Sequence, residues 1–102
     1  MCIGGDRATG YDFSKTQFLR DLDDRNVNEE LDGLEQDILT TANKLGIGPM
    51  GFGGKTTLLG VKITAANRLP ASFFVSVSYM CWAFRRHGAT LGNNGDIKKW
   101  LY

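Results

Sequence analysis

The stretch Gly46-Ile47-Gly48-Pro49-Met50-Gly51-Phe52-Gly53-Gly54-Lys55-Thr56-Thr57 holds five glycines within nine residues, followed by a lysine and two threonines. Glycine accepts positive φ angles and lets other groups come close to the backbone, although it loses more conformational entropy on folding than any other residue. Such a concentration of glycine therefore predicts a shaped loop. A helical pattern precedes the loop and a β pattern follows it, so the loop divides the chain into two halves.

The clearest helical pattern covers residues 28–45. Apolar side chains recur there at helical spacing, and acidic side chains occupy the other face near the amino end, where the helix dipole favours negative charge. Gly46 stands where glycine commonly ends a helix. We expect the acidic face to be solvated. The apolar positions are Leu31, Leu34, Ile38, Ala42 and Leu45, and the acidic ones are Glu29, Glu30, Asp32, Glu35 and Asp37.

The first residues predict the end of a strand at 2–5 that runs into a glycine turn. A second helical pattern follows over residues 11–22, with Asp12 or Ser14 as its N-cap. Asp6 and Arg7 lie between these elements and have two interpretations. They form either a polar pair directed at a ligand or an ion pair that stabilises the turn.

The β half begins with a predicted strand over residues 57–64, followed by a connection at 65–70 that ends in Pro70. Residues 72–80 give the strongest strand pattern, in which one face is apolar and the other has small hydroxyl side chains at its centre. A turn at 92–95 precedes a last strand. The sequence thus predicts one α+β domain over residues 1–102, with two helices followed by about three strands.

Composition excludes several classes of function. Twelve basic and eleven acidic side chains give a net charge of +1, which offers no electrostatic basis for nucleic acid or an anionic membrane as the main partner. No apolar run reaches the length of a membrane-spanning helix. Cys2, Cys81 and the single His87 are too few for a self-contained structural zinc site. A disulfide is conceivable, but two free thiols in a cytoplasmic protein are favoured.

The glycine stretch does not match a nucleotide-binding P-loop. Counting back from Gly54-Lys55, the Walker A pattern requires glycine at position 49, where this chain has Pro49. A P-loop also follows a strand and opens a helix, whereas here the order is reversed. A weaker possibility stays open: the loop amides with Lys55, Thr56 and Thr57 bind an anion such as a carboxylate. The alternative is a loop that packs on neighbouring strands and leaves Lys55 in solvent.

Four segments in this order resemble the class I, iron–sulphur fumarate hydratases and their tartrate dehydratase relatives. The resemblance covers essentially the whole chain and places it at the end of the N-terminal (alpha) catalytic region, as a fragment of a larger α/β domain. The segments are residues 3–5, 46–57, 69–72 (Leu-Pro-Ala-Ser) and 78–83 (Ser-Tyr-Met-Cys-Trp-Ala).

The resemblance implies an oxygen-sensitive hydro-lyase that carries a 4Fe-4S cluster and adds water reversibly across the double bond of a dicarboxylate. Cys81 matches the last of the three cysteines that hold the cluster, with a buried structural thiol as the alternative. The other two ligands fall outside residues 1–102, and Cys2 matches neither of them. We expect Cys2 to be a small core residue.

The sequence departs from the family pattern at Leu69, where some members have a histidine that contacts the substrate. Either this branch of the family polarises the substrate differently, or another residue takes the place of the histidine, for which the neighbouring Arg68 is the candidate. The acid–base residues of the family lie upstream or in the C-terminal (beta) region, so no catalytic residue is assigned within this chain. The candidates for substrate binding are Lys55, Thr56, Thr57 and Arg68.

These implications define the expected function: part of a cytoplasmic enzyme of the tricarboxylic acid cycle that converts fumarate to malate, inactive as this fragment alone. Its expected partners are the dicarboxylate substrate and a beta region or beta subunit, in a homo- or hetero-oligomer. Apolar residues at both ends of the sequence predict association with further segments or self-association. Two alternatives remain: the alpha region of a tartrate dehydratase, and a non-enzymatic binding or assembly module derived from this fold.

Overall fold

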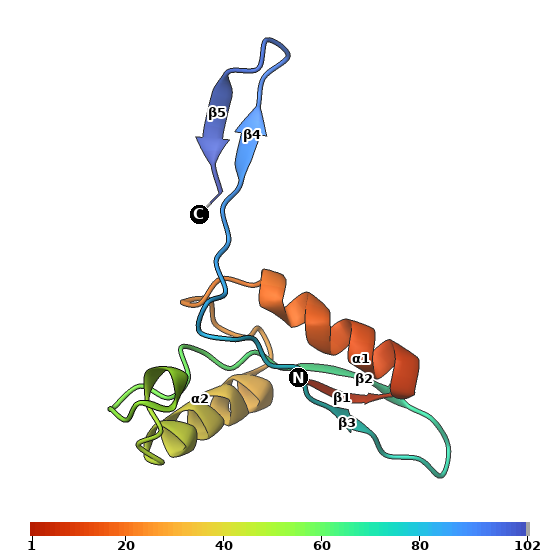
Figure 1. Cartoon of the computed structure of the whole chain (residues 1–102). Helices are drawn as coiled ribbons and strands as arrows, with labels where there is room; N and C mark the ends of the chain where they lie inside the picture. Colours follow the sequence, from red (N-terminus) through yellow and green to blue (C-terminus); the bar gives the residue numbers. More distant parts are fainter. Residues whose placement is uncertain (102) are drawn as a thin grey trace.

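The computed structural model describes residues 1–101 and confirms the α+β class. Within these described residues, two α-helices, two short 3-10 helices and five strands follow one another (Figure 1). The elements are β1 (Cys2–Gly5), α1 (Arg7–Thr16), η1 (Gln17–Leu19), α2 (Glu29–Asn43), η2 (Pro49–Gly51), β2 (Thr64–Arg68), β3 (Val75–Ser76), β4 (Ala89–Leu91) and β5 (Ile97–Trp100).

A three-stranded sheet with the order β2-β1-β3 forms one part of the molecule. β1 runs parallel to β2 and antiparallel to β3, and α1 contacts all three strands. The β4–β5 hairpin stands apart from this sheet (Figure 1). The radius of gyration is 16.4 Å, against about 13 Å for a compact domain of this length. The fold is therefore open, with little interior of its own.

Helix α1 begins and ends earlier than the predicted range 11–22, since it covers Arg7–Thr16 and only the short η1 follows it. Asp6 is its N-cap, and the Asp6 carboxylate accepts a hydrogen bond of 2.7 Å from the backbone N–H of Thr9. The proposed caps Asp12 and Ser14 instead lie inside the helix, because a capping side chain stands where the backbone leaves the extended conformation, and that point is Asp6. The Arg7 guanidinium lies over the Phe74 ring at 5.8 Å. Asp6 and Arg7 thus have separate local roles.

Helix α2 agrees with its pattern. Asn28 caps its first turn by accepting from the backbone N–H of Leu31 at 3.0 Å, and Gly46 takes a φ of 66° just after its last turn. One part of the prediction is wrong. Glu35 is not solvated, since its side chain is 1% exposed.

The Glu35 carboxylate is buried because three groups donate to it. Its Oε1 accepts from the Arg20 guanidinium at 2.7 Å, from the Asn26 amide at 2.9 Å and from the backbone N–H of Ile63 at 2.7 Å. Asn26 also donates to the carbonyl of Ile63 at 2.8 Å. A buried carboxylate with this many donors is satisfied, and it joins α2 to the segment that enters β2.

Arg20 extends this cluster to the polar segment after η1. It forms two hydrogen bonds with the Asp24 carboxylate, at 2.9 and 2.8 Å, and Lys62 donates to the same carboxylate. Hydrogen bonds from Arg20 and from Lys62 lower the pKa of Asp24 from 3.8 to about 2. Since the folded pKa lies below the ordinary value, these contacts stabilise the fold above about pH 4 and lose their contribution as the pH falls toward 2.

The predicted strand at 57–64 is wrong, as is the predicted connection at 65–70: β2 covers Thr64–Arg68. The backbone of 57–63 bonds to side chains of α2 rather than to a neighbouring strand, through Asn43 and Glu35. Pairing begins at Thr64, opposite Cys2, and further along the pair Gly4 lets the two backbones approach closely at Ala66. A Cβ on Gly4 would lie 2.0 Å from the Ala66 carbonyl oxygen.

The predicted strand at 72–80 forms regular pairing only at Val75–Ser76, although its alternation is confirmed. The small face meets α1: Ser78 shares a hydrogen bond of 2.6 Å with the buried Ser14, and Ser76 packs on Gly10. The apolar face is exposed, with Val75 50% and Tyr79 88% accessible. The predicted last strand is confirmed as β5, paired with β4 across the turn at 92–95.

Replacing Glu35 tests the buried cluster. Glu35→Ala leaves the Ile63 N–H, Asn26 and one side of Arg20 without their acceptor, so it is expected to lower the free energy of unfolding by about 3 kcal/mol, the lower end of the range for a broken buried pair. Urea unfolding followed by circular dichroism measures this. Gln36→Ala changes the exposed next residue of the helix and serves as the control. Equal stabilities of the two variants contradict the role given to Glu35.

Replacing Gly4 tests the close approach of β1 and β2. Gly4→Ala is expected to destabilise the fold by more than the backbone strain of about 1–3 kcal/mol alone, because its φ is 93° and the added methyl overlaps Ala66. Gly33→Ala in α2 has open space around it and is expected to stabilise by about 0.5–1 kcal/mol. The thermal midpoints of the two variants should shift in opposite directions.

Candidate functional site

The glycine loop closes on itself. The backbone N–H of Gly53 donates to the carbonyl of Ile47 at 2.7 Å, and those of Gly51 and Phe52 donate to Gly48 and Pro49. Gly48 is buried with a φ of 70°, and a Cβ there would lie 2.1 Å from the Gly53 backbone. Glycine at 48 is therefore required by the close contact between the two sides of the loop.

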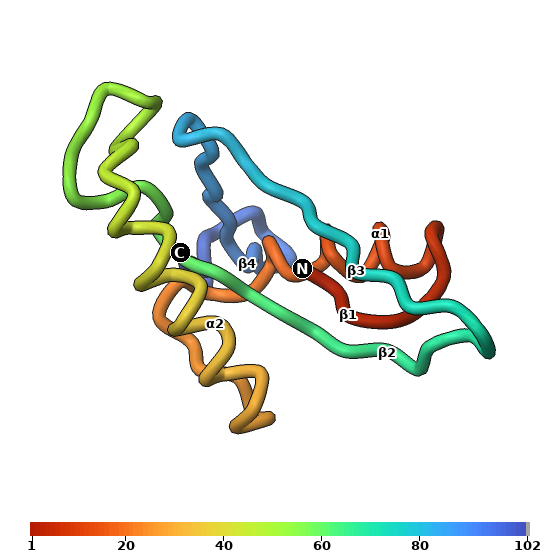
Figure 2. Tube along the Cα trace, turned by 90° about the horizontal axis from the view of Figure 1, so that it is seen from below, coloured from red at the N-terminus to blue at the C-terminus, as the bar shows by residue number. Residues whose placement is uncertain are grey.

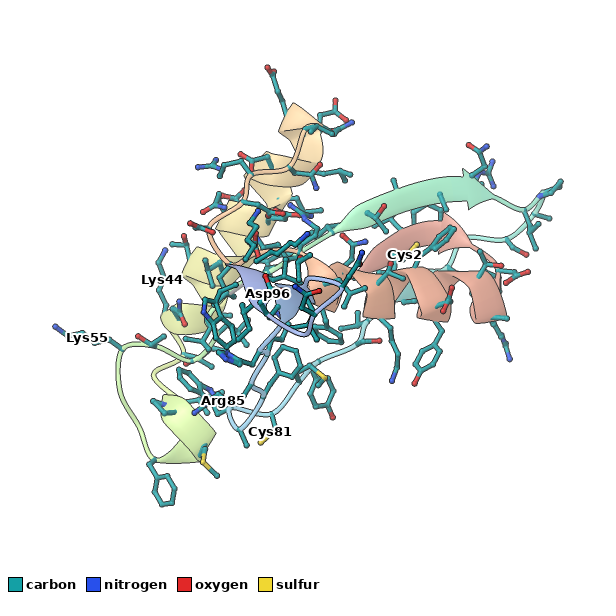
Figure 3. The ribbon with its side chains drawn as sticks, turned by 90° about the horizontal axis from the view of Figure 1, so that it is seen from above. Cys2, Lys44, Lys55, Cys81, Arg85 and Asp96 are labelled. Atoms are coloured by element: carbon teal, nitrogen blue, oxygen red, sulfur yellow. The ribbon has the colours of Figure 1, made fainter. Side chains whose placement is uncertain are left out.

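This bonding bears on the anion-binding interpretation. The N–H groups of Gly51, Phe52 and Gly53 are used inside the loop, so they do not form a free cradle for an anion. Lys55 and Thr56 are exposed, and Figure 3 shows the Lys55 side chain pointing away from the rest of the molecule. The loop follows α2 and no helix follows it directly, in agreement with the exclusion of a P-loop.

Thr57 differs from its neighbours because it is half-buried and bonded on three sides. Its hydroxyl accepts from the Gly48 N–H at 3.2 Å, and its own N–H donates to the Asn43 side chain at 2.7 Å. Its carbonyl accepts from the Trp82 indole N–H at 3.1 Å. These contacts give Thr57 a structural role and bring the loop next to the segment that contains Cys81.

Cys81 lies in a turn after β3. The backbone N–H of Phe84 donates to the Cys81 carbonyl at 2.9 Å, and the N–H of Ala83 donates to the Cys81 sulphur at 3.5 Å. The thiol is free and exposed, at the edge of the molecule in Figure 3. The predicted position at the end of a long strand is therefore replaced by a surface turn, because regular pairing stops at Ser76.

The other side of this turn is fixed to η1. Arg86 donates to the carbonyl of Phe18 at 2.8 Å and pairs with the Asp21 carboxylate at 3.1 Å. The rings of Phe18 and Phe84 lie 6.2 Å apart. Contacts on two sides thus place the Cys81 turn between the glycine loop and the region after α1.

Cys2 behaves as predicted. It is fully buried and free in β1, and burial raises the pKa of its thiol. A protonated thiol is a poor metal ligand, so the structure supports the assignment of Cys2 to the core. Figure 3 shows Cys2 and Cys81 far apart in the molecule.

Arg68 lies away from the other predicted residues. It is the last residue of β2, and Figures 1 and 2 both show that end of β2 and the glycine loop on opposite sides of the molecule. Within this chain Arg68 and Lys55 are not brought together, and their roles in substrate binding stay predictions. Leu69, next to Arg68, is likewise exposed.

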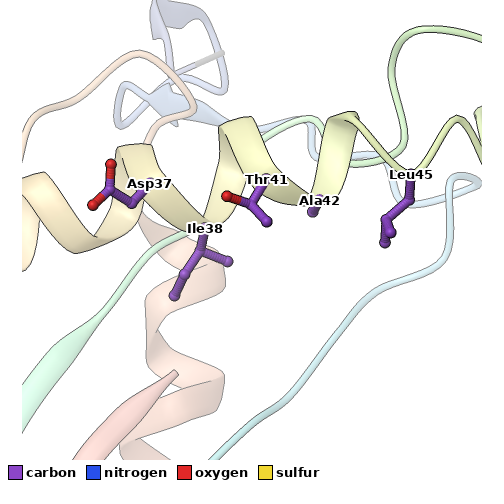
Figure 4. A pocket seen from close by; sticks show the side chains of 5 residues that line it. All are labelled: Asp37, Ile38, Thr41, Ala42 and Leu45. Atoms are coloured by element: carbon purple, nitrogen blue, oxygen red, sulfur yellow. The ribbon is translucent and has the colours of Figure 1, made fainter.

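The hollows of the surface do not form a ligand site by themselves. One lies along a single face of α2 and is open, because four of its five lining residues come from that helix and the fifth, Leu45, lies just beyond its end (Figure 4). A second lies beside the Glu35 cluster, where Arg20, Asp24 and Asn26 already bond to one another or to Glu35. Among residues 1–101, no helix is long and apolar enough to cross a membrane.

One ligand of an iron–sulphur cluster fits this structure, but a whole cluster does not. Within the described residues, no group of three or more His, Cys, Asp or Glu side chains is placed to hold a metal ion. Cys81 offers an exposed sulphur with a backbone N–H directed at it, and such hydrogen bonds are typical around cluster sulphurs. The chemistry of the donor therefore suits a single ligand position.

A sequence model of the family described as fumarate hydratase (Fumerase) matches residues 1–90. The chain belongs to the fumarate hydratase family. Its relatives include a protein of Geobacillus stearothermophilus with the provisional name fumarate hydratase class I, which is 63% identical over 98% of this chain and 20% of its own length.

Other members of the family are more distant. A protein of Methanocaldococcus jannaschii, provisionally named L(+)-tartrate dehydratase subunit alpha, is 39% identical over 82% of this chain and 30% of its own length. The L(+)-tartrate dehydratase subunit alpha of Escherichia coli is 40% identical over 82% of this chain and 27% of its own length. The chain thus spans between a fifth and a third of the length of the curated relatives that it matches.

Sequence reasoning missed two residues of this region, Asn43 and Trp82. Asn43 closes α2 just before the glycine loop, and an asparagine there signals a side chain that bonds to nearby backbone. Trp82 follows Cys81 directly, and a buried indole N–H requires an acceptor. Neither signal names the partner, Thr57, which is 14 residues from Asn43 and 25 from Trp82.

Thiol labelling tests the placement of the two cysteines. In the native chain without a cluster, Cys81 is expected to react with an aromatic disulfide reagent while Cys2 reacts only after unfolding, because exposure of the thiol controls its access. Absorbance of the released thiol should indicate one group under native conditions and both in denaturant. Cys81→Ser should abolish the native reaction, and a fast native reaction in that variant contradicts the burial of Cys2.

Proposed function

We propose that this chain is part of an iron–sulphur hydro-lyase that reversibly hydrates fumarate to malate, to which it contributes the cluster ligand Cys81 and the glycine loop. The observation that carries the proposal is the 63% identity over 98% of the chain to a relative named fumarate hydratase class I. The exposed Cys81 sulphur beside the glycine loop supports it.

Cys81 would hold one iron of a 4Fe-4S cluster, and an iron left open in such a cluster acts as a Lewis acid toward carboxylate and hydroxyl oxygens. The residues of this chain have three tasks around it. Cys81 binds as a thiolate, the Ala83 N–H donates to the sulphur, and the glycine loop keeps its shape through Thr57. Lys55 and Thr56 are exposed at the end of the loop, and in this proposal they bind a substrate carboxylate.

The remaining parts of the site must come from outside residues 1–102. One thiol cannot hold a cluster, and the described residues offer no further ligand group. The other two cysteines and the acid–base residues belong to the rest of the enzyme in this proposal. A beta region or beta subunit is the proposed partner, and the exposed apolar face of β3 provides surface that further segments can cover.

Fumarate is favoured over tartrate by a specific observation. The relatives named as tartrate dehydratase alpha subunits are 39–40% identical to this chain, well below the relative named as a fumarate hydratase. A binding or assembly module derived from the fold remains the alternative of another class. We place the enzyme in the cytoplasm, where a free thiol such as Cys81 and an oxygen-sensitive cluster persist.

Cluster content of the complete protein tests the proposal. Cys81→Ser is expected to remove most iron and acid-labile sulphide together with turnover of fumarate and malate, since loss of a thiolate opens the cluster to dissociation. Anaerobic iron and sulphide analysis, with assays on both fumarate and tartrate, gives the result.

Cys2→Ala is the matched control, because it removes the other thiol of the chain from a position in the core. The control should keep its cluster. Unchanged iron and sulphide in Cys81→Ser contradicts the assignment of Cys81. If the unmodified protein turns over tartrate but not fumarate, the result contradicts the proposed substrate and supports the tartrate dehydratase alternative.

A further inference from the structure

We infer that Asn43 and Trp82 are positioning residues for the cluster ligand: through the backbone of Thr57, they fix the Cys81 turn to the end of α2. This inference rests on the proposed function, because it concerns how the chain holds Cys81 for the cluster. Neither residue touches the cysteine sulphur, so each acts through the backbone.

The first step is the contact between Asn43 and the end of the glycine loop. Asn43 is the last residue of α2, and its side-chain oxygen accepts from the N–H groups of Thr57 at 2.7 Å and Leu58 at 2.9 Å. Its amide nitrogen donates to the Leu58 carbonyl at 3.4 Å. One half-buried carboxamide thus provides the hydrogen-bond partner that a neighbouring strand would otherwise provide for Thr57 and Leu58.

The second step passes through Thr57. While its N–H bonds to Asn43, its carbonyl accepts from the Trp82 indole and its hydroxyl accepts from the Gly48 N–H. Thr57 is therefore the point where the helix end, the glycine loop and the Cys81 turn meet. If Asn43 is removed, the acceptor of Trp82 loses its own support.

The third step joins Trp82 to the cysteine. Cys81 precedes Trp82 directly in a surface turn outside any strand, so the orientation of its backbone depends on contacts of its neighbours. The Ala83 N–H that donates to the Cys81 sulphur belongs to the same turn. Holding Trp82 thus fixes both the direction of the thiol and the hydrogen bond to its sulphur.

A purely structural role predicts something different. If Asn43 and Trp82 only stabilise the fold, cluster retention in their variants should follow overall stability. If they position Cys81, cluster retention should fall further than stability. Substitution of residues that orient metal ligands commonly lowers metal affinity or activity by about 10–100-fold. This range sets the size of the expected effect.

The experiment uses the complete protein with its cluster. The variants are Asn43→Leu, which removes every hydrogen bond of the side chain, and Trp82→Phe, which keeps an aromatic ring without the N–H. We expect each variant to lose the visible sulphur-to-iron absorption about tenfold faster in the presence of an iron chelator under anaerobic conditions. The electron paramagnetic resonance spectrum of the reduced cluster should broaden, since the sulphur has more than one orientation.

Two controls separate position from stability. Asn28→Ala removes the cap at the opposite end of α2 and should lower the thermal midpoint without a faster loss of absorption. Asn43→Asp keeps an oxygen acceptor for both N–H groups and should retain the cluster nearly as the unmodified protein does. The double variant Asn43→Leu/Trp82→Phe should be no worse than the worse single variant, because both act through Thr57.

The outcomes decide between the proposals. Loss rates in Asn43→Leu and Trp82→Phe that equal the rate in Asn28→Ala overturn the positioning role, as do fully additive effects in the double variant. Full cluster content in Cys81→Ser overturns the proposed ligand itself, independently of Asn43 and Trp82. If one of the two variants does not fold, the other decides alone: a loss rate equal to that of Asn28→Ala overturns the positioning role. If neither folds, Trp82→Tyr takes the place of Trp82→Phe, and its loss rate is judged in the same way.

Discussion

The buried carboxylate of Glu35 is the contact on which the arrangement of the chain depends. It accepts hydrogen bonds from Arg20, Asn26 and the backbone of Ile63, and these donors come from two segments that are distant in sequence. A buried charge without partners is very unfavourable, whereas a fully bonded one fixes the geometry of everything that bonds to it. Helix α2, the polar segment after η1 and the start of β2 are therefore held in one register.

The same helix organises the segment between the glycine loop and the sheet. Glu35 and Asn43 are eight residues apart and lie on the same side of α2, where they bond the backbone at Ile63 and at Thr57. These two polar side chains thus accept backbone hydrogen bonds that a neighbouring strand accepts elsewhere in the sheet. The result is that 57–63 runs along the helix, enters β2 at Thr64, and presents Thr57 to Trp82.

The fold has little apolar interior. Among residues 1–101, Cys2 and Ile63 are the buried apolar side chains, and α1 meets the sheet through Gly10, Ser14 and the small face of β3. Close packing of small residues brings α1 near the strands but buries little apolar area. The apolar face of β3 is exposed to solvent. This agrees with a chain that spans a fifth to a third of the length of its relatives.

The sequence alone determined the features that depend on local spacing. Helix α2, the strand at 2–5, the last strand and the alternation at 72–80 follow from periodicity and glycine placement, and the family follows from ordered motifs. The tertiary structure decided the rest. Glu35 is buried, β2 starts at Thr64, and Asn43 and Trp82 meet at Thr57 because donors and acceptors distant in sequence find one another only when the chain has folded. The pattern of residues in the sequence reveals which groups need hydrogen-bond partners, and only the fold reveals which groups those partners are.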